Sequence, residues 1–537
     1  MSHNTIISRS RLVTSLVVLL SVASVDAQNS SELPRIVVNI VVDQLRTDYL
    51  EAFAPLYGED GFKRLMAEAR YYRDCQQPFR SADRASGAAC ISTGAIPFDN
   101  GVPALSWLSR QTSQPVFCVD DPQYAGHQTY EKSSPSRLLT TTLSDELEMA
   151  TGKLSMVYSI APERDMAVLL AGHVADGAFW INDETGSWCG TSYYGLDYPY
   201  WASVFERMAP LSQRISKIEW APLWNGAVND FHYFHSAESE KTKPFSHKFA
   251  GDRKYRQLKN SAMVNEEVMS FVDRCLDGCA IGRDHTPDLL NIGLYAGNFD
   301  HQSVVSCPAE MQDTYVRLDY VVAHILKSVE ELVGKQGMLV VLSSTGYADS
   351  DADDIDFAQF RIPTGSFSMA RASMLLNMYL SALYGQRQYV EAIFDRQIYL
   401  DHTIIEQNQL NLAEILTRSE EFLAQMSGVR EIYTSQRLIT DAWAEGINMV
   451  RAGWNATCSG DIIIEVNPGW RVEVEQHRTY VSQGQAYISY PLFLMGPAIA
   501  ADRIATSISA AAIAPTLAQC LRIRAPNGSR EAPLILK

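Results

Sequence analysis

The residue with the clearest chemical potential is Asp43, which ends an apolar run that begins at Arg35 (Arg-Ile-Val-Val-Asn-Ile-Val-Val-Asp). A run so rich in Val and Ile predicts an inner strand of a parallel sheet. A carboxylate at the carboxyl end of such a strand lies where α/β folds place their sites, and it could serve there as a metal ligand. The other interpretation is that Asp43 caps the helix beginning near Asp48 or lies in a solvated loop, and this segment alone does not separate the two.

Other groups of polar residues are less complete as sites. Asp300 and His301 are adjacent in the chain, which favours two loop residues over a metal-binding pair. The acidic segment 349–356 lacks the Gly at the sixth place and the Glu at the twelfth that a calcium loop needs. His232 and His235 are three residues apart but have no third ligand nearby, so aromatic packing at the surface is the better interpretation.

The elements that would position these groups alternate between helix and strand. Strands are predicted at Leu154–Ile160, Ala167–Ala171, Leu289–Tyr295, Met338–Ser343, Asp461–Val466 and Pro491–Gly496. Helices are predicted at Gly61–Ala69, Asp313–Val333 and Ser507–Leu521. Strands separated by helices predict an α/β fold with a large, mainly parallel, doubly wound sheet sandwiched by helices.

The chain is expected to form one large domain over residues 34–537. Its core is predicted at 34–176, 286–349 and 461–537. The stretches 177–285 and 350–460 are richer in aromatic and loop residues, so they are predicted to be insertions that form a cap over the carboxyl edge of the sheet.

Composition and the N-terminal segment bear on where the protein works. The chain has 537 residues and a formal charge of −17, which argues against a nucleic-acid-binding surface. Residues 1–27 have the pattern of a secretory signal peptide, with Arg9 and Arg11, a short apolar stretch at 12–22 and small residues up to Ala27. The apolar stretch is too short to span a membrane. We therefore expect export to the periplasm, the outer membrane or the exterior, with no transmembrane segment after signal removal.

The chain contains nine cysteines, and this odd number leaves at least one thiol unpaired in an exported protein. Cys275 and Cys279 are close enough in sequence for a local disulfide or for half of a metal site. No second half-site accompanies them, so metal binding there is not expected. We expect a disulfide somewhere in the chain, with a pairing that the sequence does not specify.

Seven short phrases occur in an order that resembles one family. They are Val41–Arg46, Gly87–Gly94, Ala171–Trp180, Pro287–Leu290, Asp313–Asp319, Ile464–Trp470 and Ile513–Leu517. Together they resemble the secreted, zinc-dependent alkaline phosphatases of the type I phosphodiesterase and nucleotide pyrophosphatase branch of the alkaline phosphatase superfamily. The resemblance extends from about residue 34 to the end of the chain. It implies a large α/β sandwich with a cap.

The resemblance also implies a two-zinc site. One zinc ion activates a Thr nucleophile, and the other stabilises the leaving oxygen. The implied ligands are a strand-end Asp, the nucleophile, an Asp-x-x-x-His pair, an adjacent Asp-His pair and a late His. An Asn, a Lys and an Arg are implied to bind the phosphoryl oxygens.

Of the residues in that pattern, only the strand-end Asp is present, as Asp43. The nucleophile position is occupied by Arg84, whose guanidinium stays protonated and cannot act as a nucleophile. The remaining positions are Asn298 and Gln302 for the Asp-x-x-x-His pair, Thr345 and Gly346 for the Asp-His pair, Ser489 for the late His, Leu105 for the Asn, and Glu163 and Asp165 for the Lys and the Arg. Zinc sites use three or four Cys, His or carboxylate ligands, so this set does not meet the need of two zinc ions.

A buried Asp43 would need a compensating charge once zinc is lost. We expect Arg84 to pair with Asp43, Glu163 or Asp165 and to serve as a fixed cation. The alternative at this point is a water-filled cleft without charge compensation.

The favoured function is therefore an exported, alkaline phosphatase-like pseudoenzyme. It would have no catalytic residues, metal ligands or cofactor, and it would bind an unknown protein partner or serve in assembly in the cell envelope. The alternative is an active phosphomonoesterase or phosphodiesterase that uses two zinc ions in a rearranged site. A metal-free hydrolase built on Ser343, Ser344 or Thr345 has no evident base beside these residues.

Overall fold

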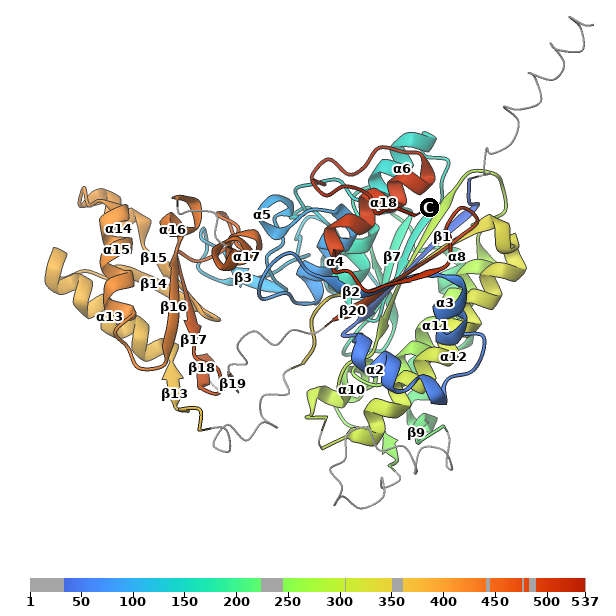
Figure 1. Cartoon of the computed structure of the whole chain (residues 1–537), viewed down its shortest axis with the longest axis horizontal. Coiled ribbons are helices and arrows are strands. Elements are labelled where there is room, and N and C mark those ends of the chain that lie inside the picture. Colours follow the sequence, from blue (N-terminus) through green and yellow to red (C-terminus); the bar gives the residue numbers. More distant parts are fainter. Residues whose placement is uncertain are drawn as a thin grey trace, which may run out of the picture.

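A computed structural model describes residues 33–223, 245–304, 306–349, 361–440, 445–475, 478–481 and 489–536. It consists of a large α/β core with a smaller lobe beside it (Figure 1). The predicted signal peptide, the two histidines at 232 and 235 and nearly all of the acidic segment 349–356 lie outside the described residues.

An 11-stranded sheet forms the centre of the core. Its middle strands run in the order β12 (Met338–Ser344), β1 (Ile36–Asp43), β11 (Asp288–Tyr295), β6 (Val157–Ile160) and β7 (Gly177–Ile181), and each pairs with the next in parallel. All residues of β1 are buried, as expected for a strand covered on both faces. The predicted α/β fold with a large, mostly parallel sheet is therefore confirmed.

The outer strands make the sheet mixed. On one side, β20 (Tyr490–Met495) lies antiparallel between β12 and β2 (Arg70–Gln76), and β21 (Asp502–Ile504) and β22 (Ile508–Ser509) extend β2 in parallel. On the other side, β8 (Trp188–Thr191) and β5 (Gly126–His127) are antiparallel.

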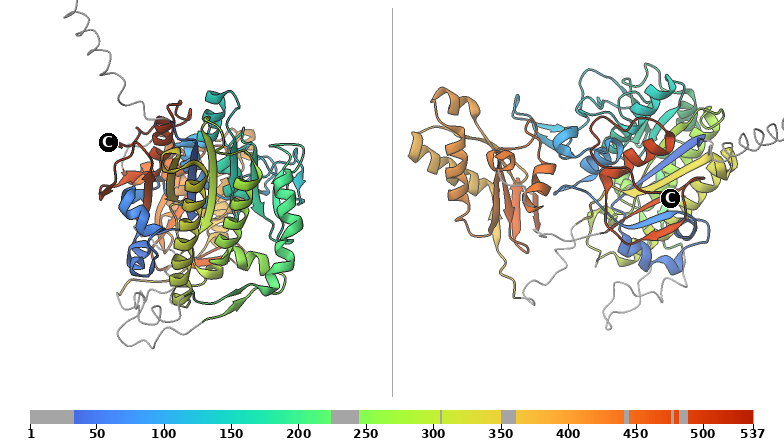
Figure 2. Two further views of the ribbon diagram at one scale, coloured as in Figure 1. Left: turned by 90° about the vertical axis from the view of Figure 1, so that its right-hand side faces the viewer. Right: turned by 45° about the horizontal axis from the view of Figure 1, so that its top comes forward.

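Helices cover both faces of this sheet (Figure 2). The helices α3 (Phe62–Glu68), α8 (Tyr200–Met208), α11 (Met263–Gly278) and α12 (Pro308–Val333) share one apolar cluster with Val38 and Ile40 of β1. The helices α4 (Arg84–Thr93), α6 (Leu143–Thr151), α7 (Arg164–Ala171) and α18 (Ile513–Leu521) share a second cluster with Val37 and Val41. Alternate β1 residues thus point to opposite faces, as the two-residue period of a strand requires.

The lobe has its own four-stranded sheet, in the order β14 (Val390–Phe394), β15 (Gln397–Leu400), β17 (Ile462–Val466) and β16 (Val429–Thr434). The helices α13 (Met369–Tyr384) and α15 (Leu412–Leu423) pack on it in a separate apolar cluster. The lobe also contains β13 (Ser366–Ser368), β18 (Arg471–Glu475), β19 (Arg478–Val481), α14 (His402–Gln407), α16 (Ser435–Thr440) and α17 (Glu445–Gly453).

Some expectations from the sequence differ from the structure. The predicted strand Ala167–Ala171 is wrong, because these residues form the end of helix α7. That helix is buried from Asp165 to Ala171, so its apolar residues show no helical period. The stretch 177–285 was predicted as a cap insertion, but its strands β7 and β8 belong to the large sheet and its helix α11 packs on that sheet. The strand predicted at Asp461–Val466 was assigned to the core, but it is β17 of the lobe.

All nine cysteines are free thiols, so the expected disulfide is absent from this structure. Cys275 and Cys279 come nearest to one, with their Sγ atoms 3.8 Å apart at the end of α11. Among the described residues, none of the helices is both long enough and apolar enough to cross a membrane.

Candidate functional site

The carboxyl ends of β1 and β12 bring Asp43 and Thr345 together. Asp43 is 3% exposed, and its Oδ1 accepts a hydrogen bond of 2.8 Å from Thr345 Oγ1. The hydroxyl of Tyr347 donates to Oδ2 of Asp43 at 3.3 Å. Burial raises the pKa of Asp43 to about 7, and the nearby charge of Arg84 opposes part of that rise. The strand-end acid is therefore held by neutral donors in a dry position.

Helix α4 carries Arg84 to the same edge of the sheet. Asp83 caps this helix, since its Oδ1 accepts from the backbone N of Ser86 at 2.9 Å and the Ser86 hydroxyl accepts in return from the N of Asp83. Gly87 allows α4 to approach β12, because a Cβ there would lie 2.0 Å from the carbonyl oxygen of Thr345. The segment 83–87 is thus built to place its first helical side chain beside Asp43.

Arg84 lies among three carboxylates. Its Nε and Nη2 donate to the two oxygens of Asp165 at 2.9 and 3.0 Å, a bidentate pair. Its Nη2 is 3.6 Å from Glu163 Oε2, and its Nη1 is 3.9 Å from Asp43 Oδ2. Burial lowers the pKa of Arg84, but Asp165, Glu163 and Asp43 raise it so strongly that it lies well above the usual arginine value. The expected ion pair is confirmed, and Asp165 is its main partner.

The ion pairs continue from this cluster to the surface. Lys259 Nζ lies 2.9 Å from Glu163 Oε2 and 2.5 Å from Asp183 Oδ1, and it donates to the carbonyl of Ile181 at 3.2 Å. Arg256 pairs with Asp183 at 3.2 Å on the exposed side. Burial and these two acids act in opposite directions on Lys259, with a net rise in its pKa, and Lys259 helps to lower the pKa of Glu163.

This second half of the network was missed in the sequence. Lys259 is 4% exposed and comes from α10 (Lys254–Lys259), whereas Asp183 follows β7. Neither residue lies in a motif, and only the fold brings them together. Helix α10 reads Lys-Tyr-Arg-Gln-Leu-Lys, so its two lysines and its arginine look alike in the sequence and nothing there marks Lys259 as the buried one.

The other predicted site positions have different partners. Gly346 has a φ of +82°, and a Cβ there would lie 2.4 Å from Gln77 Cγ. The backbone N of Leu105 donates to Asp83 Oδ2 at 2.5 Å. The carbonyl of Asn298 accepts from the Tyr295 hydroxyl at 2.7 Å, Oε1 of Gln302 accepts from Cys307 Sγ at 3.3 Å, and the carbonyl of Ser489 accepts from the N of Thr47 at 2.9 Å. The structure therefore unites Asp43, Arg84, Glu163, Asp165 and Thr345 by direct contacts. For Asn298, Gln302 and Ser489, the contacts within the described residues lie elsewhere.

The donors at this edge do not fit a pair of zinc ions. In the part of the chain that the structure describes, no group of three or more His, Cys, Asp and Glu side chains is arranged to hold a metal ion. Asp43 faces a guanidinium and two hydroxyls, where zinc would need further thiolate, imidazole or carboxylate ligands.

One His-acid pair lies near the same edge. His301 Nδ1 is 2.9 Å from Asp349 Oδ2, whose backbone N donates to Gln44 Oε1. Asp300 and His301 both have left-handed backbone conformations, with φ of 46° and 57°. The hydrogen bond to Asp349 raises the pKa of His301, and the charges of Asp43 and Arg84 also reach it. Asp300 itself pairs with Arg253 at 3.1 Å.

The class of protein follows from a match between this chain and a known family. Residues 37–487 match the type I phosphodiesterase / nucleotide pyrophosphatase family, and the chain belongs to that family within the alkaline phosphatase superfamily.

Several individual proteins are similar over nearly the whole chain. The alkaline phosphatase PafA of Elizabethkingia meningoseptica is 27% identical over 94% of this chain and 95% of its own length. A calcium-transporting ATPase of Myroides odoratus is 27% identical over 98% of each chain. The alkaline phosphatase PhoV of Synechococcus elongatus is 26% identical over 92% of this chain and 91% of its own.

Solved structures agree with the fold. The crystal structure of PafA superposes with a TM-score of 0.80 at 26% identity, over 94% of this chain and 99% of that one. A PafA variant substituted at one Thr, one Asn, one Lys and one Arg superposes with a TM-score of 0.79. These are the four residue types that the sequence resemblance implies for the nucleophile and the phosphoryl-binding positions, and the same resemblance assigns those positions to Arg84, Leu105, Glu163 and Asp165.

Proposed function

We propose that this protein is an exported member of the family that does not hydrolyse phosphate esters and acts by binding. The observation that carries the proposal is the ion-pair cluster of Arg84 with Asp165, Glu163 and Asp43. Arg84 stands at the nucleophile position, and a guanidinium held by three acids offers neither a lone pair nor a removable proton at neutral pH.

The electrostatics of the cluster oppose a phosphate substrate. Phosphoryl transfer relies on cations that neutralise charge developing on the phosphoryl oxygens. Here the two positions implied to supply a Lys and an Arg supply Glu163 and Asp165. The cations beside them are already paired, Arg84 with Asp165 at 2.9 Å and Lys259 with Glu163 at 2.9 Å. A dianion placed at this edge would meet carboxylates instead of donors.

The position of Arg84 also favours the interpretation that this site holds no zinc. Its guanidinium lies 3.9 Å from Asp43, the only family ligand present, so it supplies the compensating charge that a metal would otherwise supply. We propose that positions Asp43, Arg84, Leu105, Glu163, Asp165, Asn298, Gln302, Thr345, Gly346 and Ser489 are vestiges of the family site.

The relatives support a second candidate function, the hydrolysis of phosphate esters through a rearranged metal site. Two of the similar proteins are named alkaline phosphatases, and that similarity covers more than nine-tenths of this chain. The His301–Asp349 pair would then be the first place to seek new ligands, together with Asp43. Sequence similarity to alkaline phosphatases favours phosphate ester hydrolysis, whereas the ion pairs of Arg84 favour a binding protein without this activity.

A direct test measures turnover of p-nitrophenyl phosphate and bis-p-nitrophenyl phosphate by the purified mature protein, with and without added zinc. PafA, assayed in the same buffers, is the positive control. We expect release of p-nitrophenol at the rate of the buffer alone. Zinc-dependent turnover that His301→Ala abolishes would establish the second candidate instead.

The cellular role is part of the same proposal. Residues 1–27 support export, and the absence of phosphate chemistry directs attention to a protein partner in the cell envelope. Pull-down with the mature protein from periplasmic and outer-membrane extracts tests for such a partner. A variant such as Met374→Glu, on the exposed face of α13, is the matched control for lobe-mediated contacts.

A further inference from the structure

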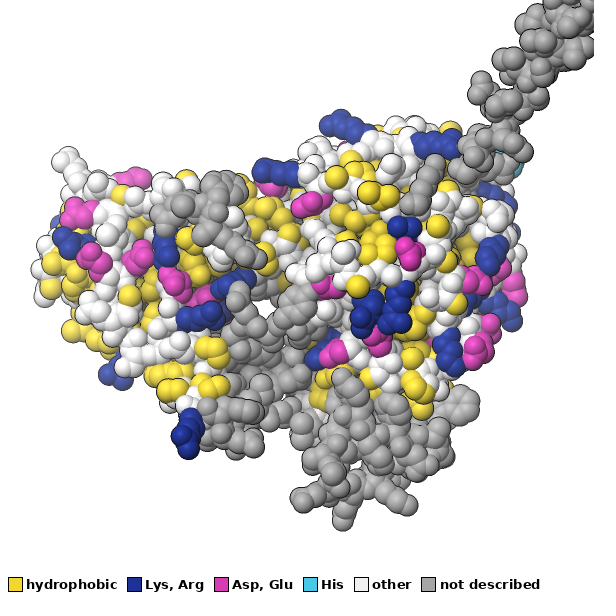
Figure 3. Space-filling model, in the orientation of Figure 1, with side chains coloured by type: hydrophobic (Ala, Val, Ile, Leu, Met, Phe, Trp, Pro, Cys, Tyr) yellow, Lys and Arg dark blue, Asp and Glu magenta, His cyan; other side chains and the backbone are white. Residues whose placement is uncertain are grey.

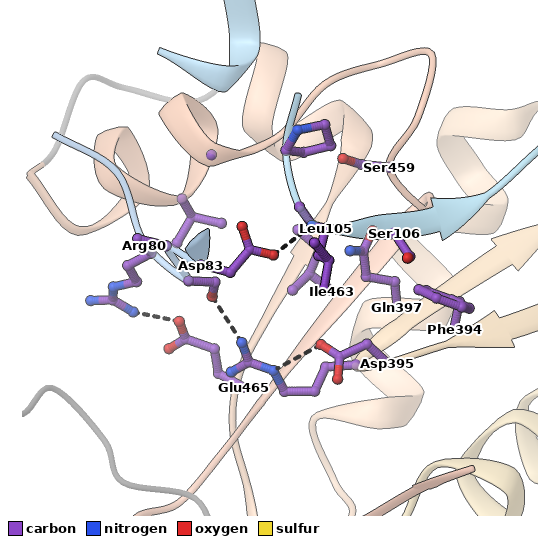
Figure 4. A pocket seen from close by; sticks show the side chains of 17 residues that line it. Arg80, Asp83, Leu105, Ser106, Phe394, Asp395, Gln397, Ser459, Ile463 and Glu465 are labelled. Atoms are coloured by element: carbon purple, nitrogen blue, oxygen red, sulfur yellow. Dashed lines mark hydrogen bonds and ion pairs between the residues drawn. The ribbon is translucent and has the colours of Figure 1, made fainter. Parts of the chain in front are cut away.

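A cavity of about 430 Å³ lies between the core and the lobe (Figure 4). The core supplies the segments 80–83 and 103–106, and the lobe supplies the segment 394–397, the end of α17 and β17. A volume of this size lies in the range of pockets that hold small organic molecules, about 300–1,000 Å³. Sites at the boundary between two bodies are common places for such ligands.

The cavity adjoins the ion-pair cluster. Asp83 lines it and directly precedes Arg84, and Leu105 lines it at the position where the resemblance implies a phosphoryl-binding Asn. The two are joined, because the backbone N of Leu105 donates to Asp83 Oδ2 at 2.5 Å. The inference therefore rests on the proposed function, since it concerns the binding space beside the vestigial site.

The charges in the cavity wall are engaged within the wall. Arg80 Nη1 lies 2.5 Å from Glu465 Oε1, an ion pair that joins core to lobe. Arg396 donates to the Ser81 hydroxyl at 2.8 Å and lies 3.7 Å from Asp395. Figure 4 shows the Arg80–Glu465 ion pair and the ion pair of Asp395 as separate dashed lines.

The remaining acid, Asp83, is also satisfied internally. It accepts from the backbone N of Ser86 and of Leu105, and burial raises its pKa. Because the charged side chains of the wall have partners within the wall, the cavity favours an uncharged ligand. Phosphate is disfavoured in particular, because three carboxylates face the cavity and each of the two guanidiniums has one of these acids beside it.

The rest of the wall alternates polar and apolar groups. Phe394, Leu105 and Ile463 provide apolar surface, and Ser106, Gln397 and Ser459 provide hydroxyl and amide groups (Figure 4). A ring molecule with apolar C–H faces and several hydroxyls matches such a wall, since hydroxyls both donate and accept. We infer that the cavity binds an uncharged, hydroxyl-rich molecule of mono- or disaccharide size, not a phosphate ester.

The experiment uses the mature full-length protein and ligand-observed NMR, followed by calorimetry, with neutral saccharides as probes. The panel is glucose, N-acetylglucosamine, maltose and cellobiose, and inorganic phosphate is the anionic probe. We expect saturable binding of at least one saccharide and none of phosphate. Phe394→Ala should weaken saccharide binding about threefold to tenfold, the effect of one aromatic contact. Ala104→Trp should abolish it by filling the cavity.

Two controls keep the outcomes separate. Met374→Ala, on an exposed face of the lobe away from the cavity, should leave the saccharide affinity unchanged. The far-ultraviolet circular dichroism of each variant should match that of the wild type, and a variant that fails this check is replaced by Leu105→Phe.

The outcomes distinguish this inference from the proposed function. Absence of binding across the panel, or binding that Phe394→Ala and the cavity-filling variant both leave intact, overturns the inference alone. Saturable binding of phosphate that Ala104→Trp removes overturns the inference and also contradicts the loss of phosphate chemistry.

Discussion

Arg84→Met is the substitution that tests the ion-pair cluster most sharply. Methionine keeps much of the side-chain length and apolar character but removes the charge and the donors. The Arg84 side chain is 15% exposed and that of Asp165 is 0% exposed, so water cannot take over the role of the guanidinium. The variant would leave a buried carboxylate without its bidentate partner.

The size of the effect follows from this burial. Removing one partner of a buried ion pair destabilises a protein by about 3–5 kcal/mol. The low exposure of both side chains means that solvent screening does not reduce this figure as it does for surface pairs. Glu163 retains Lys259 at 2.9 Å, so the loss should come chiefly from Asp165 and Asp43. We expect the free energy of unfolding of Arg84→Met to fall by about 3–5 kcal/mol.

A double-mutant cycle separates the pair from the packing. Urea unfolding, followed by tryptophan fluorescence, is measured for Arg84→Met, for Asp165→Asn and for the double variant. The double variant should be less destabilised than the sum of the two, with a coupling of about 0.5–3 kcal/mol. Arg418→Met, in an exposed pair with Glu421, is the control and should leave the midpoint unchanged. A wild-type midpoint for Arg84→Met, or strictly additive losses, would refute the idea that this ion pair replaces a metal.

Three further substitutions test neighbouring parts of the site. Lys259→Met should lower the free energy of unfolding by about 3–5 kcal/mol in urea titrations, because Glu163 and Asp183 both lose a 4%-exposed partner, whereas Lys327→Met at the surface should not. Asp43 has its pKa raised from 3.8 to about 7 in the folded state, so its contribution to stability is present at low pH and is lost as pH rises through 7; Asp43→Asn should remove this slope between pH 4 and 7. Gly87→Ala should destabilise the fold by about 1–3 kcal/mol through a clash with Thr345 O. Gly446→Ala, in α17 where a Cβ meets nothing, should cause no destabilisation in the same assay.

The large sheet was readable from the sequence because its central strands are buried on both faces. Such strands appear as mainly apolar runs of Val, Ile and Leu, and the predicted ends of β1, β11 and β12 lie within a residue or two of the observed ends. The same rule failed at Ala167–Ala171. A helix packed on every side also lacks a polar face, so a short apolar run does not distinguish it from a strand.

Only part of the site could be predicted from the sequence, because some of its contacts depend on how distant segments pack. The pairing of Arg84 with acids could be inferred because a buried Asp43 and two acids at implied cation positions need a counter-charge. Lys259 and Asp183 could not be inferred, because their contacts depend on how α10 packs against β7. The cavity beside Leu105 likewise depends on how the lobe, which Figure 3 shows at the side of the core, meets segments 80–83 and 103–106.

The zinc content of the purified mature protein tests the central claim most directly. The protein is incubated with excess zinc, desalted and analysed by elemental mass spectrometry, with PafA treated in parallel as the reference. Zinc close to zero per chain is the result that our proposal predicts, because in it Arg84 supplies the positive charge that a metal would supply. About two tightly held zinc ions per chain would contradict the assignment of a vestigial site and support an active phosphatase.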